Sequence, residues 1–270
     1  MHVGSILPAN LISHVHKMSD FTNTAVSGLS AAADYKLKLS YFGIEGAAEK
    51  VRLAFHISDL DWEDNRVAFA DWPEMKKKVP NGQLPVLEVI DKSNPSKVVT
   101  VTQSAAMCRC LGLFSKNGCA LIPTDPVMHM QMEVMLGYFD DDSRAFNPAL
   151  YMGMNPTKLG HPEGFQKTDE GKALILDLRT KYIADDLPKY AGLMSDALAS
   201  GPYLCGDSMN LADIFWLVRC RYLQSGVADG IPKTCLDAYP SVKDWYARMM
   251  SDEKIVEWYK RNPNKNLGEE

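Results

Sequence analysis

The sequence predicts an α/β domain followed by an all-α domain. Two patterns carry this prediction: short alternating apolar runs typical of strands, and broader apolar stripes typical of amphipathic helices. In the first part of the chain these patterns alternate in the order βαβαββα. Beyond residue 124 the strand signals stop and helical patterns continue to residue 262. We therefore predict domains at residues 35–116 and 124–262, preceded by an N-terminal extension at residues 1–34 that lacks clean periodicity.

The first element of the α/β domain is a strand at residues 36–41, KLKLSY. Its alternation places Leu37, Leu39 and Tyr41 on one face. The residues GIEG then end the strand, and residues 47–57 carry the apolar stripe of a helix that packs against a sheet. The domain is therefore expected to begin with a strand and a helix.

The remaining elements of this domain follow from the same two signals. They are, in order, the strand WEDNRV, the helix DWPEMKKKV, the strands LPVLEVI and KVVTVT, and the helix QSAAMCRCLGLF. In the helix DWPEMKKKV, Pro73 lies near the first turn, where the missing N–H of proline costs nothing. The turn-rich segment DKSNPS joins the two consecutive strands.

The second domain is predicted from helical patterns separated by breaks rich in Gly and Pro. The expected helices span residues 126–145, 167–199, 210–224 and 239–259. Residues 147–164, between the first two, are expected to form a long irregular insertion. At the start of the third helix, Asn210 and Asp213 have the spacing of a capping box.

Composition narrows the classes of function. The chain has 270 residues and a formal net charge of -5, and its Lys and Arg residues are scattered, so we expect no nucleic-acid partner. No apolar run approaches the roughly 20 residues that cross a bilayer, which predicts a soluble protein without a membrane span. The six cysteines lack C-x-x-C spacing, so we expect buried thiols in a reducing, cytoplasmic setting and no metal site.

Segments distributed over residues 36–259 resemble the soluble glutathione transferases in order and spacing. They are KLSYFGIEGAAEKVRLAF, ADWPEMK, NGQLPVLE, TQSAAMCRCL, GDSMNLADIFW and YPSVKDWYARMMSDEKIVEW. Together they are most similar to the sigma class, which includes the glutathione-dependent prostaglandin D isomerases. The resemblance implies a thioredoxin-like domain that binds glutathione as co-substrate and a helical domain that binds a small hydrophobic electrophile. It also implies a homodimer and a role in detoxification.

The resemblance also implies which residues form the site. Tyr41 is the expected catalytic residue, whose hydroxyl would hold the glutathione thiol as thiolate. A free thiol has a pKa of about 8.5 and is mostly protonated at neutral pH, so such a group is needed. The expected glutathione-binding residues are Phe42, Trp72, Lys76, Gln83, Leu84, Pro85, Gln103, Ser104 and Asp141. Among them, Pro85 is expected to follow a cis peptide bond, and Asp141 to reach glutathione in a second subunit.

Each of these residue types also has an ordinary structural role. A tyrosine at a strand end can simply place its hydroxyl in water, and Ser104 can be a helix cap without a ligand. Lys76 belongs to a run of three lysines, which is commonly a solvated face. Asp141 can be an exposed helical acid without further function.

The chain departs from the sigma pattern at two places. Arginines are expected after the Tyr-Phe pair, where this chain has Glu45 and Ala47, and a lysine is expected where it has Gln83. Loss of a supporting guanidinium predicts weaker thiolate activation. Two functions therefore stay open: a glutathione transferase or isomerase, and a non-catalytic subunit or ligand-binding protein with the same fold.

Overall fold

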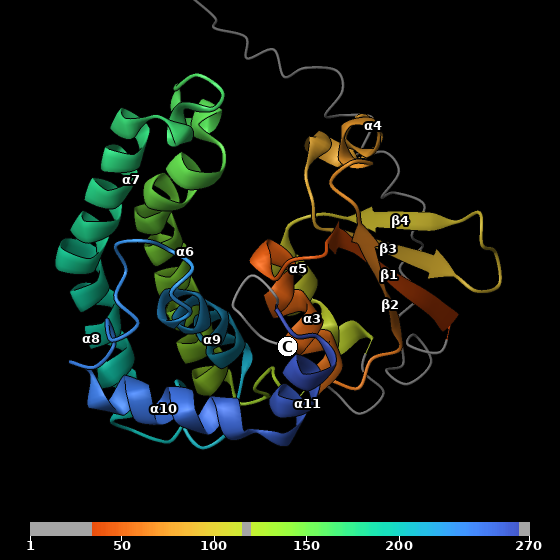
Figure 1. Cartoon of the computed structure of the whole chain (residues 1–270). Coiled ribbons are helices and arrows are strands. Elements are labelled where there is room, and N and C mark those ends of the chain that lie inside the picture. Colours follow the sequence, from red (N-terminus) through yellow and green to blue (C-terminus); the bar gives the residue numbers. More distant parts are fainter. Residues whose placement is uncertain (1–33, 115–119, 265–270) are drawn as a thin grey trace, which may run out of the picture.

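The computed structural model describes residues 34–114 and 120–264 of the chain. These residues form an α/β unit and a helical unit that lie side by side (Figure 1). The predicted extension, residues 1–34, falls outside the described residues except for Asp34. The two predicted kinds of architecture are thus both present, in the predicted order.

The described strands form one mixed sheet. They are β1 (Tyr35–Phe42), β2 (Trp62–Val67), β3 (Val86–Asp91) and β4 (Val98–Val101), in the spatial order β2-β1-β3-β4. Strand β1 runs parallel to β2 and antiparallel to β3, which in turn pairs with β4 in the antiparallel sense. Leu37, Leu39 and Tyr41 are all buried, as the alternation in β1 predicts.

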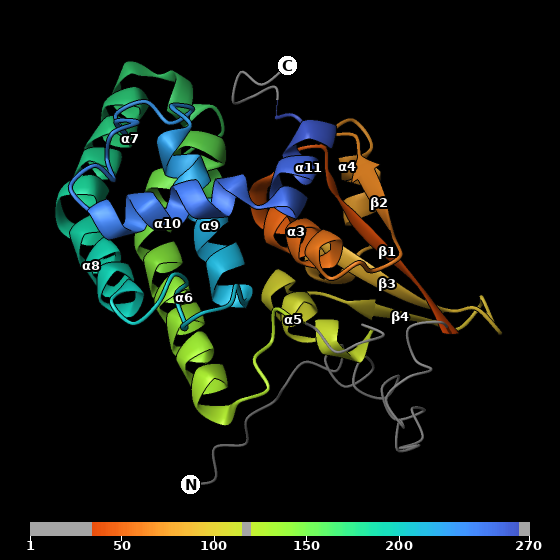
Figure 2. The same cartoon turned by 90° about the horizontal axis from the view of Figure 1, so that it is seen from below.

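Helices of the α/β unit alternate with these strands, and the last helix follows β4. They are α3 (Glu49–Ile57), preceded by the 3₁₀ turn η1 (Gly46–Ala48), α4 (Trp72–Lys76) and α5 (Ser104–Arg109). This confirms the order βαβαββα. Helices α3 and α5 lie between the sheet and the helical unit, whereas α4 lies away from that seam (Figures 1 and 2). Helix α3 packs against α5 within its own unit and against α9 and α11 of the helical unit.

The helical unit contains several long helices. They are α6 (Pro126–Met154), α7 (Asp169–Lys181), the π-helical turn η6 (Tyr182–Asp186), α8 (Leu187–Leu198), α9 (Leu211–Gln224), α10 (Pro240–Ser251) and α11 (Glu253–Arg261). The helix predicted at 167–199 is thus α7, η6 and α8 in direct succession. The helix predicted at 239–259 is divided at Asp252, whose carboxylate accepts hydrogen bonds from the backbone N–H groups of Lys254 (3.0 Å) and Ile255 (3.2 Å).

The prediction of an irregular insertion from residue 147 was wrong in its first part. Helix α6 continues through Pro148 to Met154. A proline inside a helix costs about 3 kcal/mol, because it removes a hydrogen bond and clashes with the preceding turn. Here Ala149 and Met152 continue the buried face of Phe146 beyond the proline, so packing outweighs that cost. Short 3₁₀ turns follow at Pro156–Leu159 and Phe165–Lys167.

The capping box predicted at the start of α9 is confirmed. The buried Asp213 carboxylate accepts the backbone N–H of Asn210 at 2.9 Å and of Leu204 at 3.0 Å, and the indole N–H of Trp245 at 2.8 Å. The Asn210 side chain accepts the N–H of Ala212 in return. One acid therefore joins the start of α9 to the preceding loop and to α10.

The expectation of buried thiols holds for Cys108, Cys205 and Cys220 but was wrong for Cys110, which is exposed. Cys235 is half-buried, and Cys119 lies outside the described residues. Residues two apart on a helix point in different directions, so burial of Cys108 turns Cys110 toward solvent. None of the described helices combines the length and apolar character that a membrane span needs. Across residues 34–114 and 120–264, no cluster of three or more potential metal ligands is found.

Candidate functional site

Tyr41 lies near the end of β1, with its side chain buried against the turn that precedes α3. Its hydroxyl oxygen accepts the backbone N–H of Ala47 at 3.0 Å. The turn closes this tightly because residue 46 is glycine: a Cβ there would lie 2.4 Å from the hydroxyl, and the residue has φ +44°. Among the described residues, no hydrogen bond uses the Tyr41 hydroxyl as donor, so its hydrogen is free for a ligand.

Electrostatics favour the protonated form of this hydroxyl. Burial raises the pKa of Tyr41 above its usual value, although the Ala47 N–H and the charge of Arg52 act in the opposite direction. Tyr41 therefore stays a hydrogen-bond donor at neutral pH. Such a group can stabilise an anion at the end of β1 without losing its own proton.

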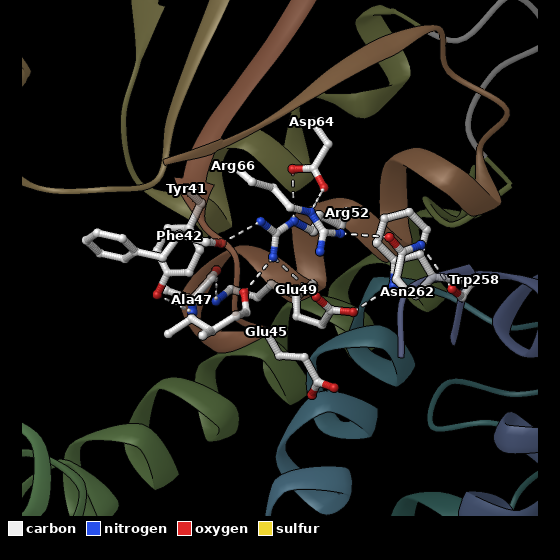
Figure 3. A network of polar contacts seen from close by, with 12 residues as sticks. Tyr41, Phe42, Glu45, Ala47, Glu49, Arg52, Asp64, Arg66, Trp258 and Asn262 are labelled. Carbon is white, nitrogen blue, oxygen red and sulfur yellow. Dashed lines mark hydrogen bonds and ion pairs between the residues drawn. The ribbon is translucent and has the colours of Figure 1, made fainter. Parts of the chain in front are cut away.

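Arg52, on α3, contacts the backbone between β1 and η1 (Figure 3). Its guanidinium donates to the carbonyl of Ile44 at 2.6 Å, to the carbonyl of Phe42 at 2.9 Å, and to the carboxylate of Asp64 on β2 at 3.1 Å. A second carboxylate, Glu49, lies 3.5 Å away. Because the side chain of Arg52 is only 1% exposed, these partners replace water almost completely.

Sequence reasoning missed Arg52, although a signal was available. Ala48, Val51 and Phe55 follow the spacing of a buried helical face, and Arg52 completes it at i, i+3, i+4 and i+7. An arginine within such a face must find polar partners inside the protein. Their identity could not be read from that pattern.

Glu45, where the sigma pattern carries an arginine, forms an ion pair with the helical unit. Its carboxylate lies 3.1 Å from both Nε and Nη2 of Arg221 on α9, and the side chains are 15% and 7% exposed. The Arg221 guanidinium also lies 3.8 Å from the ring centre of Tyr259 on α11. In this chain the turn after Tyr41 carries the acid, Glu45. The guanidinium that pairs with it belongs to Arg221 on α9.

Glu49 links the same region to the last helix. Its carboxylate accepts the indole N–H of Trp258 on α11 at 2.7 Å (Figure 3). Burial and, to a smaller extent, the charge of Glu45 raise the pKa of Glu49 to about 7, although Arg52 and the Trp258 hydrogen bond act in the opposite direction. Arg52 of α3 and Arg221 of α9 thus hold the turn before α3, and Trp258 of α11 holds the first residue of that helix.

The aromatic residues of the predicted site lie together. The Phe42 ring is 5.4 Å from that of Tyr41, stacks on Phe69 at 4.6 Å, and meets the edge of Trp72 at 5.4 Å. Trp72 begins α4, so this cluster joins the end of β1 to the segment after β2. The structure therefore brings Tyr41, Phe42 and Trp72 into one group.

The other predicted residues of the α/β unit occupy the segments before β3 and α5. The stem of Lys76 packs over Gly82, where an added Cβ would lie 3.2 Å from its Cγ, and so reaches the turn before Gln83. The Leu84–Pro85 peptide bond is cis, as predicted. Gln103, directly before α5, has φ 70°, a conformation that residues other than glycine rarely adopt.

The three consecutive aspartates of α6 have three different surroundings. Asp140 is exposed, and Asp141 pairs with Arg144 of its own helix. Asp142 is fully buried, where it accepts a hydrogen bond from Tyr182 at 2.5 Å and lies 2.8 Å from Arg219. The structure does not bring Asp141 together with Tyr41 within one chain, and sequence reasoning missed the buried ion pair of Asp142.

Comparisons with known proteins agree with this architecture. A family model described as "Glutathione S-transferase, C-terminal domain" matches residues 164–262. The chain is 31% identical over 228 residues to glutathione S-transferase 1 of Ascaris suum, covering 84% of this chain and 96% of that protein. It is 27% identical over 238 residues to hematopoietic prostaglandin D synthase of Homo sapiens, covering 85% and 98%.

A solved structure is similar in fold. The sigma class GST of Fasciola hepatica superimposes with a TM-score of 0.67 at 21% identity, covering 86% of this chain and 99% of that one. The likeness extends over both the α/β unit and the helical unit.

Proposed function

The chain belongs to the glutathione S-transferase family, and we propose that it is an active glutathione transferase that holds the glutathione thiol as thiolate at Tyr41. The thiolate would then attack a hydrophobic electrophile bound against the helical unit, in a conjugation or an isomerisation. The observation that carries this proposal is the hydrogen bond from the Ala47 N–H to the Tyr41 oxygen. It holds the hydroxyl in place and leaves its hydrogen to point at a ligand.

The energy available from this arrangement suits the task. A hydrogen bond to a charged acceptor contributes about 1.5–3 kcal/mol, which lowers a thiol pKa by about one to two units. Because the Tyr41 oxygen already accepts the Ala47 N–H, its own O–H is polarised and becomes a better donor. The glutathione thiol, with an ordinary pKa of about 8.5, would then be largely ionised at neutral pH.

We propose that glutathione lies along the end of β1, the turn before β3 and the start of α5. Trp72, Lys76 and Gln83 would contact its glycyl end, and Phe42 would support the Tyr41 turn. The Leu84 backbone, set by Pro85, would pair with the peptide, while Gln103 and Ser104 would receive the γ-glutamyl carboxylate. Asp141 would reach the amine of glutathione in a second subunit.

Loss of the family arginines does not leave this turn unsupported. Arg52 donates to the carbonyls of Phe42 and Ile44, and Arg221 holds Glu45. These contacts favour the catalytic function over the non-catalytic alternative, because they hold Tyr41 and its turn in one geometry.

The first test is the thiol pKa of bound glutathione in a Tyr41→Phe variant. We expect the variant to bind glutathione but to lose most conjugating activity, because only the donor to the thiolate is removed. The thiol pKa, followed by ultraviolet difference titration, should rise by about one to two units. Tyr35→Phe, at the other end of the same strand, is the matched control and should leave the pKa as it is.

The result also separates the two functions. Glutathione at about 100 times its Kd should stabilise the wild-type chain by about 2.7 kcal/mol in thermal melting. Stabilisation without any shift of the thiol pKa would point to a ligand-binding protein. An unchanged pKa in the Tyr41→Phe variant of an active enzyme would move the catalytic role to another residue.

We further propose a homodimer, located in the cytoplasm. Val127, Met130 and Val134 share one face of α6 by their spacing, yet each is more than half exposed. An apolar helix face in water is typical of an association surface, and a second copy is the occupant that the role proposed for Asp141 requires.

Sedimentation should therefore show a dimer. We expect Val134→Glu to shift this dimer toward monomer, whereas the control Val256→Glu, on the exposed face of α11, should leave it unchanged. A wild-type monomer that binds glutathione normally would exclude this assembly.

A further inference from the structure

Lys50 places a cation at the seam between the two units. It is the second residue of α3 and is half-buried, and its ammonium donates to the carbonyl of Ala47 at 3.1 Å. The same ammonium lies 5.4 Å from the ring centre of Phe215 on α9 and 6.0 Å from that of Phe139 on α6. The side chain therefore crosses from the Tyr41 turn to the aromatic surface of the helical unit.

Within residues 34–114 and 120–264, the Lys50 ammonium forms no ion pair with a carboxylate. Among the described residues, none brings a carboxylate oxygen within 4.0 Å of the Lys50 ammonium, and burial lowers its pKa. The charged and titratable groups that act on it are Cys108, Arg219 and Asp140. Arg219 already has a partner in Asp142, at 2.8 Å, so Lys50 is the cation of this group that remains available to an anion.

The position of the Lys50 ammonium relative to Tyr41 indicates which molecule would carry that anion. Ala47 donates its N–H to the Tyr41 oxygen and accepts the Lys50 ammonium on its C=O. One residue of the turn thus contacts both the Tyr41 hydroxyl, where the thiolate is proposed to lie, and the Lys50 ammonium. The ammonium also lies 6.0 Å from the ring centre of the half-buried Phe139 on α6, so the Tyr41 turn, this cation and the aromatic surface of the helical unit adjoin one another.

We propose that Lys50 recognises a carboxylate on the electrophile, so that the preferred substrates are apolar electrophiles carrying one negative charge. The inference rests on the proposed function, since it concerns the second substrate of that reaction. A single ammonium is a compact point charge, which matches a monoanion, and the flanking Phe139 and Phe215 rings suit an apolar body. The hydrogen bond to the anion would replace the water that Lys50 loses on burial.

The test compares two activated aryl chlorides of similar shape, one neutral and one carrying a carboxylate. We expect Lys50→Met to lower the selectivity in kcat/KM for the carboxylate-bearing electrophile about tenfold relative to the neutral one. Lys50→Arg should retain most of that selectivity, because it retains the charge. Lys36→Met, which removes an exposed lysine paired with Glu63, is the control and should leave the selectivity unchanged.

A second readout does not depend on turnover. The S-aryl glutathione conjugates of both compounds are titrated into the wild-type chain and into Lys50→Met, and the same tenfold change is expected in the ratio of their Kd values. If both conjugates lose affinity equally in the variant, Lys50 acts by positioning Ala47 and the proposal is wrong. If the conjugates bind with the expected ratio while neither chloride reacts, catalysis at Tyr41 is overturned and the recognition by Lys50 stands.

Discussion

Arg52→Met is expected to lower the free energy of unfolding by about 3–5 kcal/mol, because it removes one partner from a buried ion-pair network. Methionine fills much of the same volume, so the loss measures polar contacts more than packing. Without the guanidinium, the carbonyls of Phe42 and Ile44 lose this donor, and the buried carboxylate of Glu49 loses its nearby positive charge. Denaturant unfolding monitored by tryptophan fluorescence measures the change.

Arg66→Met is the matched control. Arg66 also bonds the carboxylate of Asp64, at 2.8 Å, and it contacts Asn262 at 2.7 Å, but its side chain is 41% exposed. An exposed ion pair contributes about 0–1 kcal/mol, so this variant should stay close to the wild type. Equal losses in the two variants would show that Arg52 is no more than a surface contact to Asp64.

Glu45→Arg is expected to destabilise the chain by a similar amount, about 3–5 kcal/mol, although it restores the residue of the sigma pattern. The new guanidinium would face Arg221, which is 7% exposed and packs over the Tyr259 ring, with little water to screen the repulsion. Because Glu45 precedes the turn that binds the Tyr41 hydroxyl, the variant should also raise the thiol pKa of bound glutathione.

Reversing both charges tests whether the pair itself is responsible. Glu45→Arg combined with Arg221→Glu should recover most of the lost stability. The coupling energy of the pair is the change in stability of the double variant minus the sum of the changes in the two single variants. Lys36→Glu, in the exposed pair with Glu63, is the comparison and should change the stability little, because solvent screens exposed charges. A double variant whose loss of stability equals the sum of the losses in Glu45→Arg and Arg221→Glu would show that the two residues act independently.

The sequence by itself determined the features that depend on neighbours in the chain. The alternation of Leu37, Leu39 and Tyr41 set the buried face of β1, and the spacing of Asn210 and Asp213 set the start of α9. The order of elements followed in the same way, because periods of 2 and 3.6 residues are local properties. The motif around Tyr41 also pointed to the residue whose hydroxyl the structure holds in place.

Only the tertiary structure decided which residues support that hydroxyl. The partner of Glu45 is Arg221, 176 residues later, and the partner of Glu49 is Trp258, 209 residues later. No periodicity relates such positions. From the motif alone, the absence of its arginines therefore predicts loss of a supporting guanidinium, and only the packing of α9 and α11 against α3 shows which residues replace it. The same holds for α6, where Pro148 predicts a break and burial of Phe146, Ala149 and Met152 preserves the helix. In each case a contact between distant segments outweighed a local preference, because burial of a face or a charge involves more free energy than the propensity of one residue.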